Sequence, residues 1–339
     1  MKALALFWAA GCIAFGQNWQ PDVTHAQFKT VPYSGDLGAQ IRAASPQWFG
    51  YAVQSIRAQN GNCCWNGSSG CWLEGENRGQ HAMQSSKPVP LEGSDAIAIL
   101  FRVENNKVEK IRAFSLSCPL DAGGLPFVWL TGVPARASLA FLEEFATGEP
   151  DRLENAAIFA IAQHNGSAAD DVLDRLTRPT EPEHTREKVV FWLGASRGAR
   201  GVSTLRRILA ADPSEQVRDK AVFALSIGKQ PEALNVLIQT AKTDKSAHVR
   251  GQAFFWLAHK AGKRASAAIA NAAENDPDTE VKKKAVFALS QLPKDEGIPK
   301  LIEVARTQRN PEVRKQAFFW LGQSHDPRAL AFIEQVLTR

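Results

Sequence analysis

The sequence predicts a mostly α-helical protein, an α-solenoid of about six two-helix repeats of 32 residues that follows a small β-rich, disulfide-bonded domain. A phenylalanine recurs every 32 residues in the second half of the chain. The first half contains the cysteines and short runs of alternating apolar residues, which indicate strands. We expect a signal peptide over 1–16, a β-rich domain over 17–133, a capping helix or linker over 134–152 and the solenoid over 153–339.

The composition is that of a globular protein. Of 339 residues, 44% are hydrophobic and 22% are charged, which excludes a disordered or fibrous chain. The net charge is only +5, and the positive surplus lies in the second half. This is far below the basic density of a nucleic-acid binder, so we expect no nucleic-acid partner. No apolar run is long enough to span a membrane.

The first residues have the pattern of a secretory signal. Lys2 precedes a short apolar stretch that ends in Ala14-Phe15-Gly16, a small-x-small pattern that signal peptidase accepts. Lipoprotein processing at Cys12 and a buried N-terminal helix are the alternatives. We expect export to the periplasm or the extracellular space.

Four cysteines would remain after cleavage: Cys63, Cys64, Cys71 and Cys118. An even number in an oxidising compartment favours disulfides. Adjacent cysteines rarely bond to each other, so the expected pairs join Cys63 or Cys64 to Cys71 or Cys118. A zinc site that also uses His81 lacks the usual ligand spacing, and we expect no metal.

The first half of the chain shows strand patterns. Residues 97–103 alternate, Asn105-Asn106 gives a turn, and alternation resumes over 108–116, which predicts a β-hairpin. Further strands are expected at 48–53 and 127–130, and a helix at 135–147. Trp65 and Trp72 flank a glycine-rich loop, which suggests either a structural knot on a disulfide or a ligand surface.

The second half repeats one motif. The recurring phenylalanines are Phe159, Phe191, Phe223, Phe255, Phe287 and Phe319. Each lies in a predicted helix that often begins after an Asp-Pro or Asn-Pro turn, where proline suits the first helical turn. A second helix follows each one, expected at 202–210, 231–241, 265–273, 297–306 and 327–337. Units that bury little alone must stack into a solenoid.

The run from Asp212-Pro213 to Val217-Arg218 and Leu225, with its weaker copies, resembles HEAT repeats, in particular the short bacterial class named after phycobilisome lyases. The whole chain also resembles exported bacterial HEAT-repeat proteins. The resemblance implies a structural ladder of charged residues between neighbouring units. Its members would be Asp212, Asp244 and Asp276 with Arg186, Arg218, Arg250, Lys282 and Arg314. The last unit departs from the pattern, with Gln308 in place of the aspartate.

The recurring phenylalanine points away from the core face of its helix. When Val217 is position one, positions one, five, eight, nine and twelve share a face at about 100° per residue, and Phe223 at position seven lies nearly opposite. The HEAT resemblance implies that this helix lines the concave surface. The rings form either a closed inner core or a partner groove with candidate residues Phe191, Phe223, Phe255, Phe287 and Phe319.

Other positions of this helix also follow the repeat. Position ten is always small, which allows neighbouring helices to pack closely. Position eight alternates between alanine and tryptophan (Ala160, Trp192, Ala224, Trp256, Ala288, Trp320), which predicts interdigitation in the core, with binding anchors as the alternative. Lys220 and Lys284 flank the phenylalanines and form either a solvated face or a basic rim for an acidic partner.

The motifs of common enzymes are missing from the sequence, including G-x-S-x-G, H-E-x-x-H and the phosphate-binding loop. We expect a non-catalytic scaffold of the cell envelope that binds a protein or peptide partner along the concave groove and uses no cofactor. The alternative is a lyase-like protein that binds a tetrapyrrole or another small ligand. A nucleic-acid binder is the least favoured hypothesis.

Overall fold

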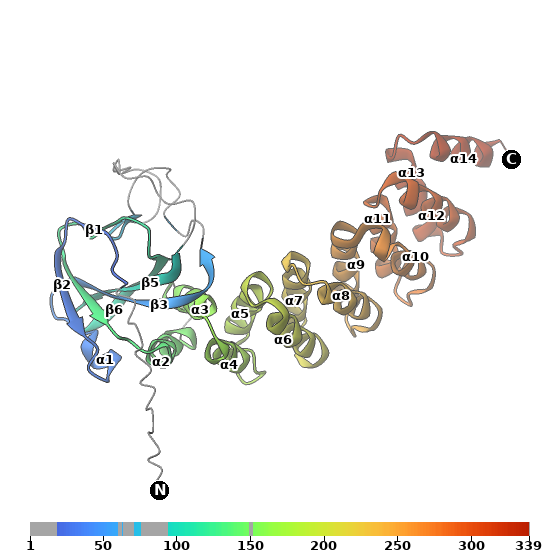
Figure 1. Ribbon diagram of the computed structural model, residues 1–339. Helices are drawn as coiled ribbons and strands as arrows, with labels where there is room; N and C mark the ends of the chain where they lie inside the picture. Colours follow the sequence, from blue (N-terminus) through green and yellow to red (C-terminus); the bar gives the residue numbers. More distant parts are fainter. Residues whose placement is uncertain (1–18, 60–62, 64–70, 76–93, 149–151, 339) are drawn as a thin grey trace, which may run out of the picture. The chain divides into compact units, whose positions relative to one another are not determined.

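The computed structural model describes residues 19–59, 63, 71–75, 94–148 and 152–338 (Figure 1). The chain divides into two compact units, Met1–Ser138 and Leu139–Arg339. The predicted signal peptide over 1–16, the alternative processing site Cys12, and Cys64 and Trp65 all lie outside the described residues.

A five-stranded sheet organises the N-terminal unit. Its order is β2–β8–β3–β5–β6, in which β2, β8 and β3 run parallel and β3, β5 and β6 run antiparallel. The strands are β2 (Gln27–Pro32), β3 (Gln47–Gln59), β5 (Ser94–Glu104), β6 (Lys107–Ser115) and β8 (Pro126–Thr131). The predicted hairpin is confirmed as β5–β6. Its turn residues Asn105 and Asn106 have φ of 51° and 58°, the left-handed values that a two-residue hairpin turn requires.

Short strands and a disulfide cover one face of this sheet. The strands β1 (Val23–Thr24), β7 (Leu120–Asp121) and β4 (Cys71–Trp72) pair in parallel. A core that includes Trp48, Phe127 and Trp129 lies beneath them. The described disulfide joins Cys63 to Cys118, one of the expected pairings. Cys71 is also disulfide-bonded. A short helix, α1 (Leu37–Gln40), begins at Asp36, which accepts a hydrogen bond from the amide of Ala39.

A buried polar network fastens the cysteine-bearing segment to the sheet. Glu74 Oε1 accepts hydrogen bonds from Trp48 Nε1 and Arg102 Nε, both at 2.7 Å. Lys110 Nζ donates to the Glu74 backbone oxygen at 2.8 Å. These bonds hold the segment after β4 against β3, β5 and β6.

Helices make up the rest of the chain. They are α2 (Ala135–Ala146), α3 (Arg152–Gln163), α4 (Ser167–Leu176), α5 (Glu183–Ser196), α6 (Gly198–Ala211), α7 (Glu215–Ile227), α8 (Glu232–Thr243), α9 (Ala247–Ala261), α10 (Ser266–Asn275), α11 (Thr279–Ser290), α12 (Lys294–Thr307), α13 (Pro311–Gln323) and α14 (Pro327–Leu337), with a 3₁₀ turn η1 (Gly262–Ala265) before α10. The later phenylalanine helices start at side-chain caps, in which Ser214, Ser246, Asp278 and Asn310 each accept a backbone N–H.

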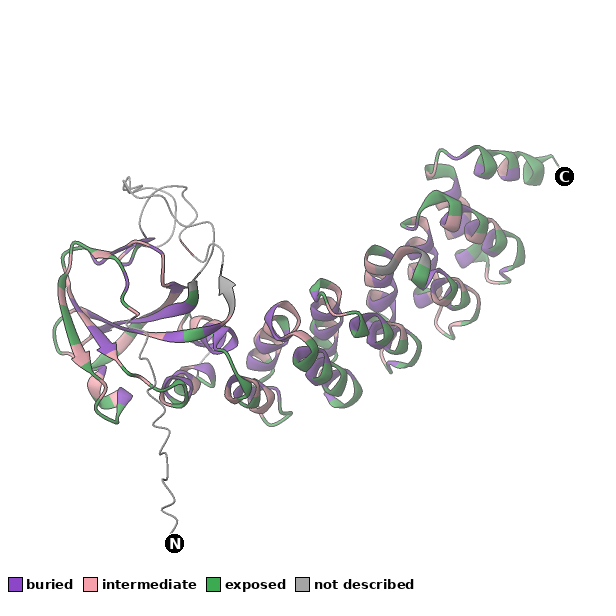
Figure 2. Ribbon diagram, in the orientation of Figure 1, coloured by how far each residue is buried: buried purple, intermediate pink, exposed green. Residues whose placement is uncertain are grey.

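The C-terminal unit is an α-solenoid of two helix layers, as predicted. The phenylalanine helices α3, α5, α7, α9, α11 and α13 form one layer, and the helices that follow them form the other (Figure 1). Buried residues lie where the helices meet (Figure 2), and positions such as Val217, Ala221 and Leu225 are fully buried. Neighbouring phenylalanine helices pack against each other more closely than neighbouring second helices do. The array therefore curves toward the phenylalanine layer, which forms its inner face.

Small residues at position ten allow this close packing. A side chain at Gly194 would place its Cβ 2.1 Å from the backbone oxygen of Ala224 in the next helix, closer than real contacts come. Gly322, at the same position of the last unit, has nothing within 4 Å of such a Cβ. The requirement for a small residue therefore arises from the following unit.

Candidate functional site

The inner face carries a continuous series of aromatic rings, which we call the aromatic row. Successive members have ring centroids 4.8 to 6.4 Å apart. In spatial order the row is Phe159, Trp192, Phe191, Phe223, Trp256, Phe255, Phe287, Trp320 and Phe319. Centroid separations of this size are typical of interacting aromatic pairs. The row joins all six units along one face.

The row is partly open to solvent, so the two hypotheses for the phenylalanines describe one surface. Phe191 is 38% exposed and Phe319 53% exposed, whereas Phe223, Phe255 and Phe287 are half-buried. Their rings stack on one another, as a closed core would require. Enough of each face remains accessible for a partner to contact it.

The tryptophans lie in this row and not in the closed core that we expected. Trp192, Trp256 and Trp320 are only half-buried, whereas the alternating Ala160, Ala224 and Ala288 are fully buried. Each indole packs against the phenylalanine of its own unit and that of the preceding unit, at 4.8 to 5.1 Å. An indole is too large for the space that alanine fills and extends sideways into the row. The true repeat of this surface is therefore two units, or 64 residues.

The predicted lysines border the row among acidic residues. Lys220 is exposed, and the stem of Lys284 lies against Gly251. Lys188 is paired with the buried carboxylate of Glu154. His248 Nε2 lies 3.6 Å from Asp219 Oδ1, and Lys283 Nζ lies 2.9 Å from Glu280 Oε1. The border is of mixed charge and not uniformly basic.

The implied charged ladder is present over three interfaces. Each arginine binds the aspartate of the next unit through two hydrogen bonds of 2.9 to 3.2 Å. The pairs are Arg186–Asp212, Arg218–Asp244 and Arg250–Asp276, all largely buried. Each aspartate also accepts a backbone N–H just before the next helix, from Ser214, Ser246 or Asp278. These residues are structural.

The ladder changes at both ends. Lys282 occupies the arginine position opposite Gln308, whose amide donates to the Ala273 oxygen at 2.9 Å. Arg314, at the same position of the last unit, is exposed. At the first unit the position holds Glu154, which is fully buried and accepts a 2.8 Å hydrogen bond from Thr185. The sequence motif could not reveal Glu154, because it reverses the charge of its position.

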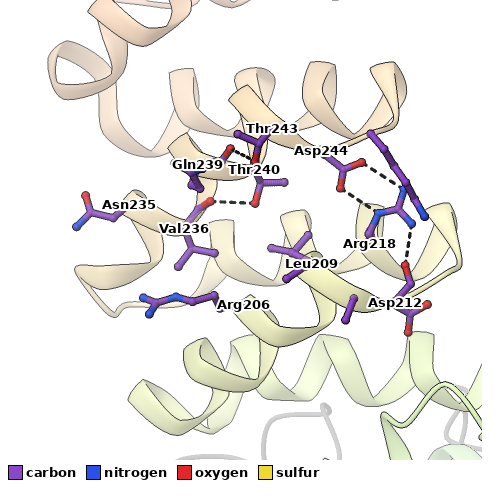
Figure 3. A pocket seen from close by; sticks show the side chains of 13 residues that line it. Arg206, Leu209, Asp212, Arg218, Asn235, Val236, Gln239, Thr240, Thr243 and Asp244 are labelled. Atoms are coloured by element: carbon purple, nitrogen blue, oxygen red, sulfur yellow. Dashed lines mark hydrogen bonds and ion pairs between the residues drawn. The ribbon is translucent and has the colours of Figure 1, made fainter.

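A groove of about 630 Å³ lies on the outer layer between α6 and α8 (Figure 3). Its wall includes Arg206, Gln239 and Thr243, and the Arg218–Asp244 pair lies at one end. Arg218 also donates to the Asp212 oxygen at 2.9 Å. The charged groups at this end are thus bonded to each other.

Titratable groups elsewhere are structural. Burial lowers the pKa of His164 to about 4, and its Nδ1 hydrogen-bonds the Ala160 oxygen at 2.8 Å. Trp72 is 40% exposed on β4. Within the described residues, no cluster of His, Cys, Asp and Glu could hold a metal ion. None of the described helices has the length and apolar character needed to cross a membrane.

Comparison with known families identifies the repeats. Residues 169–258 and 266–339 match the family model of HEAT repeats, so the C-terminal unit is a HEAT-repeat solenoid. A comparison with curated proteins gives no match.

Similar solved structures share the chain at low identity. Human deoxyhypusine hydroxylase is 17% identical over 59% of this chain and 89% of that chain, with a TM-score of 0.28. The complex of CpcE and CpcF of phycocyanin lyase from Nostoc sp. PCC7120 is 19% identical over 60% and 84%, with a TM-score of 0.34. A designed armadillo repeat protein is 18% identical over 55% and 100%, with a TM-score of 0.30. We draw no functional conclusion from likeness at this level.

Proposed function

We propose that the protein is a non-catalytic scaffold that binds a protein or peptide partner along the inner face of its solenoid. The observation that carries this proposal is the aromatic row, with Phe191 and Phe319 exposed at 38% and 53%. Contiguous exposed apolar surface usually marks a binding site. Aromatic residues are also enriched among the side chains that contribute most to binding energy.

The row is well organised for binding before a partner arrives. Each ring is held by its neighbours at centroid separations of 6.4 Å or less. Binding therefore costs little further side-chain entropy, which raises the affinity available from a given contact area. A row that crosses every unit suits an extended segment better than a compact small molecule.

The border of the row suggests the character of that segment. Lys220 presents an exposed ammonium group beside Phe223, and Lys284 borders Phe287 one helix turn away. A segment with apolar side chains on the rings and carboxylates beside these lysines would match both features.

We further propose that the protein acts outside the cytoplasm, in the cell envelope or beyond it. The Cys63–Cys118 disulfide supports this location, because such bonds persist in oxidising compartments. The signal-like pattern over 1–16 supports it independently. The absence of catalysis is consistent with the ladder carboxylates, which are occupied by arginines and helix-start amides.

Site-specific photo-crosslinking in the native host tests the proposal. A photoreactive residue replaces Phe319 or Phe191, and the control replaces Lys242, which is exposed on the second helix α8. We expect one recurrent adduct from both row positions and none from Lys242. Adducts confined to the chain itself, or equal labelling from all three positions, would refute binding along the row. A chromophore that co-purifies with the protein would instead favour the small-ligand alternative.

A further inference from the structure

Cationic side chains seal the ends of two phenylalanine helices. Lys260 Nζ in α9 donates to the backbone oxygens of Ser226, at 2.8 Å, and Gly228, at the end of α7. At the end of α3, Arg197 Nη1 donates to the oxygens of Ala162 at 3.2 Å and His164 at 2.7 Å.

The two cradles are copies of each other. Ala162 and His164 lie 64 residues before Ser226 and Gly228, so the same pair of carbonyls receives a cation at both interfaces. The last carbonyls of a helix have no intrahelical donor, and the helix dipole makes this end negative. A positive group with several N–H donors meets both needs.

The third copy has no such side chain. Its carbonyls belong to Ser290 and Leu292 at the end of α11, and Ser324 occupies the position of Lys260. Ser324 Oγ turns back to the Leu321 oxygen of its own helix at 2.6 Å. A cavity of about 210 Å³ lies here, lined by Ser290, Leu292 and Ser324.

The other walls of this cavity are apolar. Trp320, Ile298 and Leu301 line it, and the last two are 3% and 1% exposed. Trp320 Nε1 is buried and has no hydrogen-bond partner among the described residues, unlike the indole nitrogens of Trp192 and Trp256. Packing is thus incomplete where the cationic side chain is replaced by serine.

We propose that this cavity binds a primary ammonium group on an alkyl stem, such as a lysine side chain supplied by another molecule. The ammonium would donate to the Ser290 and Leu292 oxygens, as Lys260 does at the preceding copy. The stem would lie along Trp320, Ile298 and Leu301. The site is at the helix ends and does not depend on binding along the aromatic row.

One cation already lines the cavity without filling it. Lys294 is exposed at the start of α12. Arg328, and more weakly Lys294, lower the pKa of Asp326 to about 2, which places Lys294 in the field of that carboxylate. Its charge is therefore partly balanced outside the cavity.

Thermal unfolding of the full chain with n-butylammonium as the probe tests this site, with n-butanol at equal concentration and equal ionic strength as the control. A ligand at ten times its Kd should raise Tm by roughly 3 °C in a saturable manner. Ser324→Lys should raise the Tm of the free protein and abolish the response, because its own ammonium would fill the cradle. Ser324→Met should abolish the response by filling the cavity with an uncharged side chain.

Lys260→Ala provides a matched check on the chemistry. It should lower Tm, and n-butylammonium should restore more of the loss than n-butanol does. No saturable rise for the natural protein, an equal rise with n-butanol, or a full response in both Ser324 variants would overturn the proposal. If either variant fails to fold, the natural protein and the other variant still decide the outcome.

Discussion

Replacing Arg218 by methionine should destabilise the solenoid by removing one side of a buried ion pair. Arg218 is 2% exposed, holds Asp244 through bonds of 2.9 and 3.2 Å, and caps the Asp212 oxygen at 2.9 Å. The Asp244 carboxylate would remain buried without its counter-ion. Breaking such a pair costs about 3–5 kcal/mol. We expect a loss of about 4 kcal/mol in the free energy of unfolding.

Urea titration followed by helical circular dichroism measures this loss, with Arg314→Met as the matched control. Arg314 has the same helical position but is exposed, so its change should be within about 0.5 kcal/mol. The double variant Arg218→Lys/Asp244→Gln copies the natural Lys282 and Gln308 combination and should recover at least half of the loss. A cost below about 1 kcal/mol for Arg218→Met, or equal costs at the two arginines, would refute the structural role of the ladder.

Three further predictions concern stability. Because the folded His164 has a pKa of about 4 against 6.5 when unfolded, the unfolded chain binds more protons between these values, so the free energy of unfolding should fall by up to about 3 kcal/mol as pH drops from 6.5 to 4; His164→Gln should flatten this dependence in unfolding titrations at several pH values. The double variant Cys63→Ala/Cys118→Ala should cost about 2–4 kcal/mol, and mass spectrometry of unreduced, alkylated natural protein should find neither thiol free. Gly194→Ala should cost about 1–3 kcal/mol by overpacking against the next helix, whereas Gly322→Ala should stabilise by about 0.5–1 kcal/mol; equal effects would contradict the close packing.

The repeat architecture could be predicted because the same residues recur at fixed spacing. Six phenylalanines at 32-residue intervals define the inner helices, and Asp-Arg pairs at matching positions predict the ladder that the structure contains. Helix starts were also visible, since Ser214 and Asp278 are the capping residues that such turns favour.

Contacts between units could not be predicted in the same way. A helical wheel places Trp192 near the core face, but it does not show that the indole reaches Phe159 of the preceding unit. Glu154 and Ser324 were missed because each departs from the repeat, and their significance depends on which groups of the adjacent helix they face. The choice of Cys118 as the partner of Cys63 depends on how the small strands lie over the sheet.

Affinity for the partner isolated by crosslinking tests the central claim most directly. Titration calorimetry would compare the natural protein with Phe191→Ser, Phe319→Ser and the control Leu330→Ser, which alters a 59% exposed apolar residue on α14 away from the row. The account predicts that each row variant raises Kd by about tenfold, equivalent to about 1.4 kcal/mol, while Leu330→Ser leaves it unchanged. Unchanged Kd in both phenylalanine variants, or an equal loss in all three, would contradict binding along the aromatic row.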